Sequence, residues 1–182
     1  MVGVLLCHFV VVLLSIATTF DQQTLSIFNL NHTPTGFAPL HISAMSGHTD
    51  MTKLLLEHKA NVNLTTKEAG SPLSQACDEG FVEVARLLIA AGARVNYKDP
   101  STLESALHLA AEHGNLALVK LLVDSHAELN GWDEEGRTPL TRAIRKRRND
   151  VVAYLRSVGA KEKSADSGSE SAESESEGSE SD

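Results

Sequence analysis

Histidine, cysteine and carboxylate side chains are the residues of this chain that could do acid–base or metal chemistry. The 182 residues include eight histidines, 24 Asp and Glu, and two cysteines. No histidines stand four residues apart around a carboxylate, and there is no Cys-x-x-Cys, glycine-rich phosphate loop or Gly-x-Ser-x-Gly elbow. Cys77 stands at a small-residue helix position, where we expect it to pack like an alanine. We therefore predict no catalytic residue, no metal site and no cofactor.

Composition and charge exclude several further classes of protein. Residues 161–182 hold eight of the 24 acids and two of the 16 basic residues, which leaves 14 basic and 16 acidic side chains in residues 1–160. This nearly neutral body argues against a globally basic nucleic-acid binder. Two cysteines cannot form a disulfide scaffold. With 4% aromatic residues, the core must be built from Leu, Val, Ile and Ala.

Four segments in the middle of the chain share one template. The words APLH, SPLS, SALH and TPLT begin at residues 38, 71, 105 and 138, which gives spacings of 33, 34 and 33 residues. Glycines downstream keep the same step, at 47, 80 and 114, as do the asparagines at 63, 96 and 130. A period of this length, with several landmarks in register, indicates stacked supersecondary units.

This pattern resembles the ankyrin repeat family over about residues 31–160. The resemblance implies an all-α repeat solenoid, in which helix-turn-helix units stack and β-hairpin loops project. It divides the chain into four repeats, at about residues 31–63, 64–96, 97–130 and 131–160. The family uses the histidine of the opening word as a structural hydrogen-bond partner, and we expect this role for His41 and His108.

The physical chemistry of single residues supports helices at these positions. Ser71, Ser105 and Thr138 are good N-caps, and a proline after the cap loses only an amide hydrogen that has no helical partner. Glycine supplies the left-handed conformation that ends the first helix of a unit. The second helix, such as residues 82–89, has an apolar stripe with charge outside.

The third and fourth units depart from the template. Arg142 and Arg156 stand where other units carry apolar residues such as Leu109 and Val123. Charge at positions that would meet a next repeat predicts that the fourth unit is a C-terminal cap. The third unit has one extra residue within 98–104, which predicts a longer or distorted loop.

The two ends of the chain have compositions of their own. Residues 1–30 lack Lys and Arg, and residues 2–17 are apolar apart from His8 and Ser15. Three interpretations stay open for this segment: a cleaved signal peptide, a helix packed on the first repeat, and a membrane anchor. Residues 161–182 contain eight serines and eight acids, so we expect this acidic tail to be disordered.

The acidic tail also carries a phosphorylation pattern. Ser167, Ser174 and Ser179 each have an acid three residues further on, which is typical of sites for acidophilic kinases. Each phosphate adds about 1.5 to 2 negative charges. The alternative is a passive tail that keeps the protein soluble.

With no catalytic motif, the function must lie on the surface. The family resemblance implies that partners contact the loop tips and the exposed side of the first helices, which line a concave groove. The matching residues are Phe37, Met45, Asp78, Glu79, Lys98, Glu112, His113, Trp132, Glu134, Glu135, Arg137, Arg145 and Lys146. Trp132 is either an anchor for a partner or packed on the neighbouring loop. The acids of this face favour a basic partner, unless they form only a solvated face.

A run of five basic residues lies within Arg142–Arg148. It has three interpretations: complementing a helix dipole at the end of the stack, nuclear import, and binding of phosphate or nucleic acid. No aromatic residue is interleaved with it, so the case for nucleic acid is weak. The run could also dock the acidic tail of its own chain.

The sequence therefore predicts a non-catalytic protein–protein interaction module, such as an adaptor, scaffold or regulatory subunit. The alternative is a nuclear chromatin- or nucleic-acid-associated factor that uses Arg142–Arg148. We expect a monomer in the cytoplasm or nucleus, or a protein of the secretory pathway if residues 1–17 are a cleaved signal.

Overall fold

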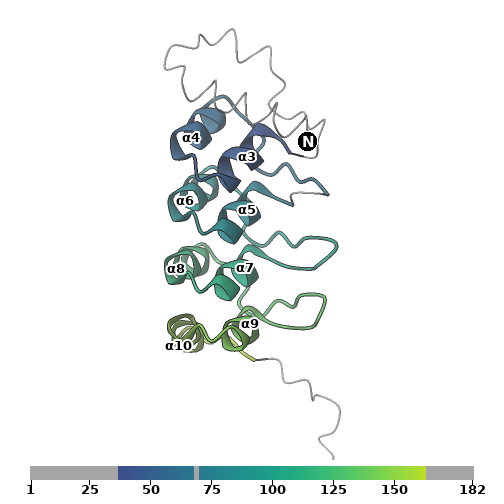
Figure 1. The fold of residues 1–182 in the computed structure, drawn as a ribbon, viewed down its shortest axis with the longest axis vertical. Coiled ribbons are helices and arrows are strands. Elements are labelled where there is room, and N and C mark those ends of the chain that lie inside the picture. The colour runs from purple at the N-terminus through teal and green to yellow at the C-terminus, as the bar shows by residue number, and fades with distance from the viewer. Residues whose placement is uncertain (1–36, 68–69, 163–182) are drawn as a thin grey trace, which may run out of the picture.

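The computed structural model describes residues 37–67 and 70–162, which form four helix-turn-helix pairs stacked in one row (Figure 1). The first helices of the pairs lie beside the projecting loops, and the second helices form the other layer. In chain order the helices are α3 (Pro39–Met45), α4 (Thr49–Glu57), α5 (Pro72–Glu79), α6 (Val82–Ala90), α7 (Ala106–His113), α8 (Leu116–Asp124), α9 (Pro139–Arg145) and α10 (Asn149–Ser157). The predicted all-α repeat solenoid is confirmed.

The loops that project from the stack pair only through short contacts in this part of the chain. Isolated antiparallel bridges join Thr66 to Gly70 and Lys98 to Ser105. The predicted N-terminal segment, residues 1–30, and the acidic tail after residue 162 lie outside the described residues.

The predicted caps begin the first helices. Ser71 and Thr138 accept hydrogen bonds from the amides three residues on, at 3.1 and 3.2 Å, and proline follows each cap. Ser105 and His108 form a capping box, in which the Ser105 amide donates to His108 Nδ1 at 3.2 Å. In the first pair Ala38 stands at the cap position and provides no side-chain bond.

Left-handed residues end both helices of every pair. The first helices are followed by Gly47, Gly80 and Gly114, with φ of 70°, 87° and 79°, but in the fourth pair the same position is Arg147, with φ of 58°. The corresponding position after the second helix is Lys59, Gly92, His126 or Gly159, with φ between 60° and 89°. A side chain in this conformation is strained, at a cost of about 1–2 kcal/mol.

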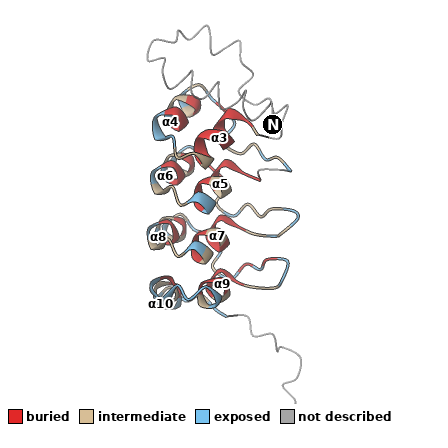
Figure 2. Ribbon diagram, viewed as in Figure 1, coloured by how far each residue is buried: buried red, intermediate tan, exposed pale blue. Residues whose placement is uncertain are grey.

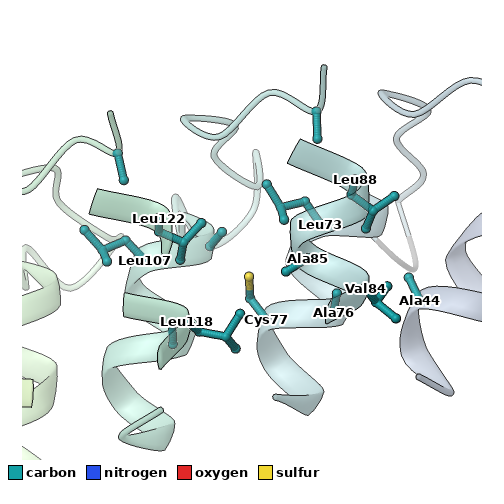
Figure 3. Close-up of a cluster of buried hydrophobic side chains, with 14 of the residues drawn as sticks. Ala44, Leu73, Ala76, Cys77, Val84, Ala85, Leu88, Leu107, Leu118 and Leu122 are labelled. Carbon is teal, nitrogen blue, oxygen red and sulfur yellow. The ribbon is translucent and has the colours of Figure 1, made fainter. Parts of the chain in front are cut away.

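Leucine and alanine fill the space between the two layers (Figure 2). Figure 3 shows Cys77 of the second pair beside Leu118 of the third, with Leu73 and Leu88 in the core of the second pair and Leu107 in that of the third. Each of these side chains is at most 1% exposed. Full burial of one leucine contributes about 1.5–3 kcal/mol, so stacking is the main source of stability for units this small.

A repeated asparagine joins each pair to the next on the loop side. Asn63 Nδ2 donates to the Gly92 carbonyl oxygen (3.0 Å), and its Oδ1 accepts from the Arg94 amide (2.8 Å). Asn96 forms the same two bonds with His126 and Glu128. These bonds recur at the repeat spacing and fix the register of the stack.

Candidate interaction surface

Two buried histidines connect consecutive repeats. His108 Nδ1 accepts from the Ser105 amide (3.2 Å), so its proton lies on Nε2, which faces the Arg137 carbonyl oxygen of the next repeat (3.1 Å). His41 Nε2 lies 3.3 Å from the Gly70 carbonyl oxygen. Burial lowers the pKa of both rings and favours the neutral form. The predicted structural role of these histidines is confirmed.

Cys77 packs in the core, as predicted. Burial, together with the charge of Asp78, raises the pKa of its thiol to about 12. At neutral pH this group is therefore no thiolate nucleophile.

Among the described residues, no group of three or more His, Cys, Asp or Glu is arranged to hold a metal ion. None of the helices in the described part of the chain has the length and apolar character needed to cross a membrane.

The exposed side of the first helices and the loops around them form what we call the inner face. A hollow of about 250 Å³ lies there between the loops before α5 and α7. Its walls include Lys67, Ser74, Asp78, Asp99 and Glu104. The hollow is therefore polar and carries three carboxylates.

Asp99 shapes the longer third loop that borders this hollow. Its carboxylate accepts from the Ser101 hydroxyl and from the Ser101 amide at 2.8 Å, and these bonds hold the pKa of Asp99 below its ordinary value. The Asp99 carbonyl oxygen accepts from the Leu103 amide (2.8 Å). The turn forces Leu103 to a φ of 55° and leaves it 44% exposed. The predicted distortion of this loop is confirmed.

All the sequence-predicted partner-binding residues lie on first helices or on the loops and turns beside them. Most are exposed: Asp78, Glu79, His113, Trp132, Glu134, Glu135, Arg145 and Lys146. The others are partly buried: Phe37, Met45, Lys98, Glu112 and Arg137.

Trp132 lies on the loop before α9 and is 56% exposed. A backbone bond from the Glu134 amide to the Thr102 carbonyl oxygen (2.9 Å) joins this loop to the third one. Within residues 37–67 and 70–162, the large apolar side chains that stay exposed are Leu103 and Trp132. Leu103 lies on the third loop and Trp132 on the loop before α9, so both belong to the two loops that this bond joins.

Arg142 is the residue that sequence reasoning interpreted wrongly. It is 4% exposed and points back to the third repeat, not towards a following one. Nη1 donates to Glu112 Oε2 and Nε to Asp133 Oδ2, both at 2.8 Å, and Nη2 donates to Glu104. A long side chain can turn towards buried carboxylates that a periodic pattern does not reveal. Arg142 therefore gives no support to the C-terminal cap.

Two of the carboxylates around Arg142, those of Asp133 and Glu112, are held ionised. Burial raises the pKa of Asp133, but hydrogen bonds from Arg137 and Arg142 outweigh it and bring the value to about 2. Arg137 Nε lies 2.8 Å from Asp133 Oδ2. Burial also opposes ionisation of Glu112, yet Lys146 and Arg142 lower the pKa of Glu112 below its ordinary value. Asp133 and Glu112 are thus charged at neutral pH.

These ion pairs change the predicted acidic groove. Glu104 and Glu112 both pair with Arg142, and Glu135 pairs with Arg137 at 2.6 Å. Glu79 and Glu134 remain exposed acids of the inner face, and neither has an ion-pair partner among the described residues. Negative charge is therefore concentrated near α5 and on the loop tips.

The basic run does not form one continuous cationic surface. Arg142 is buried, Lys146 Nζ pairs with Glu112 Oε1 (2.9 Å), and Arg148 Nε donates to the Glu112 carbonyl oxygen (3.0 Å). Arg145 and Arg147 form no ion pair with another described residue. The alternative function that used all of Arg142–Arg148 as a nucleic-acid surface is therefore not supported by this arrangement.

Stacked helix pairs with an open inner face define this protein as an α-solenoid repeat protein. A family model described as ankyrin repeats (3 copies) matches residues 8–99 and again residues 100–166. The chain belongs to the ankyrin repeat family. The first match begins inside the apolar N-terminal segment.

Curated relatives share the repeats within different proteins. The chain is 42% identical over 101 residues to ankyrin repeat and KH domain-containing protein 1 of Homo sapiens, which covers 55% of this chain and 4% of that protein. It is 33% identical over 121 residues to a transient receptor potential cation channel subfamily A member 1 homolog of Caenorhabditis elegans, covering 66% of this chain and 10% of the channel. It is 31% identical over 143 residues to the probable 26S proteasome regulatory subunit p28 of Saccharomyces cerevisiae, covering 76% and 62%. The chain thus spans less than two thirds of each of these relatives.

Proposed function

We propose that this chain is a non-catalytic interaction module that holds a partner protein against its inner face. The exposure of Trp132 is the observation that supports this most directly. The ring is 56% exposed on the loop before α9. Tryptophan is enriched among the few residues that dominate binding energy at protein interfaces.

The chemistry of the inner face favours a partner segment with basic and apolar side chains. The hollow beside α5 carries Asp78 and Asp99 in addition to Glu104, which Arg142 binds, and Glu79 lies exposed beside it. Such charges steer association and select partners more than they raise affinity. Because the stack positions the face before binding, little of the described chain has to become ordered.

The relatives support the same role by analogy of fold. One of them is named as a regulatory subunit of the 26S proteasome, and a subunit acts through contacts with other chains. An adaptor, scaffold or regulatory role for this chain follows from that analogy.

Affinity enrichment from the native cell tests the proposal. Full-length wild type is compared with Trp132→Ala and with the double variant Asp78→Lys/Glu79→Lys, and each protein that co-purifies is quantified. Loss of an aromatic anchor costs about 2 kcal/mol, so Trp132→Ala should lower recovery of a direct partner by more than tenfold at limiting concentration.

The control is Glu57→Lys/Asp124→Lys, which makes the same charge change at exposed residues of α4 and α8. It should leave recovery unchanged. Partners that are lost with the control but kept by both inner-face variants would show that the second-helix layer is the binding surface, and the proposal would then be wrong.

A further inference from the structure

Charged side chains link the ends of successive first helices along the inner face. Asp78 Oδ1 lies 3.7 Å from His113 Nδ1, and Glu112 Oε1 lies 2.9 Å from Lys146 Nζ. Arg145 stands at the repeat position of Asp78 and Glu112. It is exposed, and within the described part of the chain it has no ion-pair partner.

Two more arginines are exposed at template positions that are partly buried in the other repeats. Arg147 corresponds to Gly114, which the Arg148 side chain covers so closely that an added Cβ would lie 2.5 Å from its Cδ. Arg156 corresponds to Val123, which packs against the core. We call Arg145, Arg147 and Arg156 the cationic end face.

The chain leaves α10 along this end of the stack. The Lys161 amide donates to Asn130 Oδ1 (2.7 Å), and its carbonyl oxygen accepts from Thr138 Oγ1 (3.0 Å). Directly after it, Glu162 Oε1 pairs with Arg156 Nη2 at 2.7 Å. The first acid after α10 is therefore already bound to the cationic end face.

The sequence that follows complements this face in charge. Residues 163–182 contain seven acids, one lysine and eight serines, whereas residues 131–160 contain seven basic and four acidic residues. Asp150, in the first turn of α10, is the exposed acid nearest to Arg147 in sequence. It forms no ion pair with a described residue.

The length of residues 163–182 does not limit their contact with the cationic end face. Twenty residues reach about 60–70 Å when extended, whereas the nine residues of α10 span about 14 Å. A segment tethered beside its site has an effective concentration of about 1 mM, so even a weak charge contact is populated.

We propose that residues 163–182 bind back onto the cationic end face of their own chain, and that phosphate on Ser167, Ser174 and Ser179 strengthens this contact. Arginine forms bidentate bonds with phosphate as well as with carboxylate, so modification adds acceptors for the same three residues. The contact lies at the end of the stack and leaves Trp132 and the hollow beside α5 open.

Energy transfer within the full-length chain measures the contact. Trp132 is the one tryptophan and serves as donor. An acceptor is attached at Ser181→Cys in a Cys7→Ser background, where buried Cys77 stays unlabelled because burial raises the pKa of its thiol to about 12. Transfer should be high at low salt and fall as NaCl is raised to about 1 M, because salt screens exposed charges.

Two triple variants sharpen the test. Arg145→Gln/Arg147→Gln/Arg156→Gln should lose most of the salt-sensitive transfer. Lys53→Gln/Arg86→Gln/Arg94→Gln, with the same change of charge at exposed residues of the first two repeats, should keep it. Treatment with an acidophilic kinase should raise the NaCl concentration at which half of the salt-sensitive transfer is lost. Donor-only samples of each variant correct for direct effects on Trp132.

Three results would overturn the proposal. Transfer that salt does not change, or that both triple variants reduce equally, would show that the end face does not hold the segment. Transfer that rises with protein concentration and vanishes on dilution would assign the contact to a second copy of the chain.

Discussion

The second and fourth repeats share one helix-turn-helix template, but the fourth adds a buried ionic network to the apolar packing that holds both. In the second, α5 and α6 bury Cys77, Val84 and Leu88, each at most 1% exposed. In the fourth, Arg142 lies inside the contact between α9 and α7 and is surrounded by carboxylates. Its counterpart in the third repeat is Leu109. One position of the template thus accepts a leucine or a guanidinium, provided that the neighbours supply its partners.

The ionic network of the fourth repeat shows how the loop that carries Trp132 is held in place at the inner face. Apolar packing has little directionality, whereas a buried arginine with three carboxylates has one good geometry. Removing one member of a buried ion pair costs about 3–5 kcal/mol, because the remaining charge loses its partner. Trp132 lies next to Asp133, so the same network positions the candidate anchor.

The largest effect on the free energy of unfolding should come from Leu88→Ala in the second repeat. Leu88 is fully buried in α6, and truncation there should lower the free energy of unfolding by about 3–4 kcal/mol. Urea unfolding followed by far-UV circular dichroism measures it. Leu103→Ala, at a 44% exposed site, is the control and should cost less than about 1 kcal/mol. Equal losses for the two variants would contradict the assignment of Leu88 to the core.

Arg142→Ala should lower the free energy of unfolding by about 3 kcal/mol, and the fourth repeat should unfold before the others. The variant leaves Asp133, whose side chain is fully buried, with Arg137 as its remaining cation. Trp132 fluorescence should report an earlier urea transition than circular dichroism, because the terminal repeat separates before the stack unfolds. Arg94→Ala, an exposed cation of the second repeat, should stay within about 0.5 kcal/mol of wild type.

Acid should remove part of the stability of the fourth repeat. The pKa of Asp133 is about 2 in the folded chain against an ordinary 3.8, so its contribution is complete above about pH 4 and is lost as the pH falls to about 2. The shift corresponds to about 2 kcal/mol. Urea unfolding at a series of pH values measures the slope. Asp133→Asn should flatten it in this window, and an unchanged slope would refute the role of Asp133.

The smallest expected effect is a gain in stability. Arg147 holds a φ of 58° where other repeats have glycine, so Arg147→Gly should raise stability by about 0.5–1 kcal/mol. Gly80→Ala, at a φ of 87°, is the matched reverse change and should lower it by about 1 kcal/mol. Thermal unfolding of both variants compares them directly. A loss of stability in Arg147→Gly would mean that the Arg147 side chain forms contacts worth more than the strain.

The periodic features of the fold could be predicted from the sequence, and the unique ones could not. Caps and glycine turns follow from residue type and spacing, because each depends on neighbours within one or two turns. The roles of His41 and His108 follow from the family resemblance. Arg142 was missed because its partners lie 9 to 38 residues away, and a periodic pattern reads an isolated charge as surface. Left-handed residues without glycine, such as Lys59 and Arg147, carry no signal of their own.

The candidate inner face was predicted only in outline. Residue numbers transfer from the repeat template, but charge on the face depends on which carboxylates find a cation. Glu112 resembles Asp78 in the template, yet it is bound by Arg142 and Lys146, while Asp78 contacts only His113 at 3.7 Å among the ion pairs of the described residues. That distinction requires coordinates.

Hydrogen exchange of the full-length chain tests most directly the claim that one stack is held by two forces. Amide protection is compared between wild type and Arg142→Ala at neutral pH by mass spectrometry. We expect protection to fall in α9 and α10 and to persist in α5 and α6, because the ionic network joins the fourth repeat to the third and does not include the second. Protection that stays unchanged in α9 and α10, or that falls evenly through all the helices, would contradict the account.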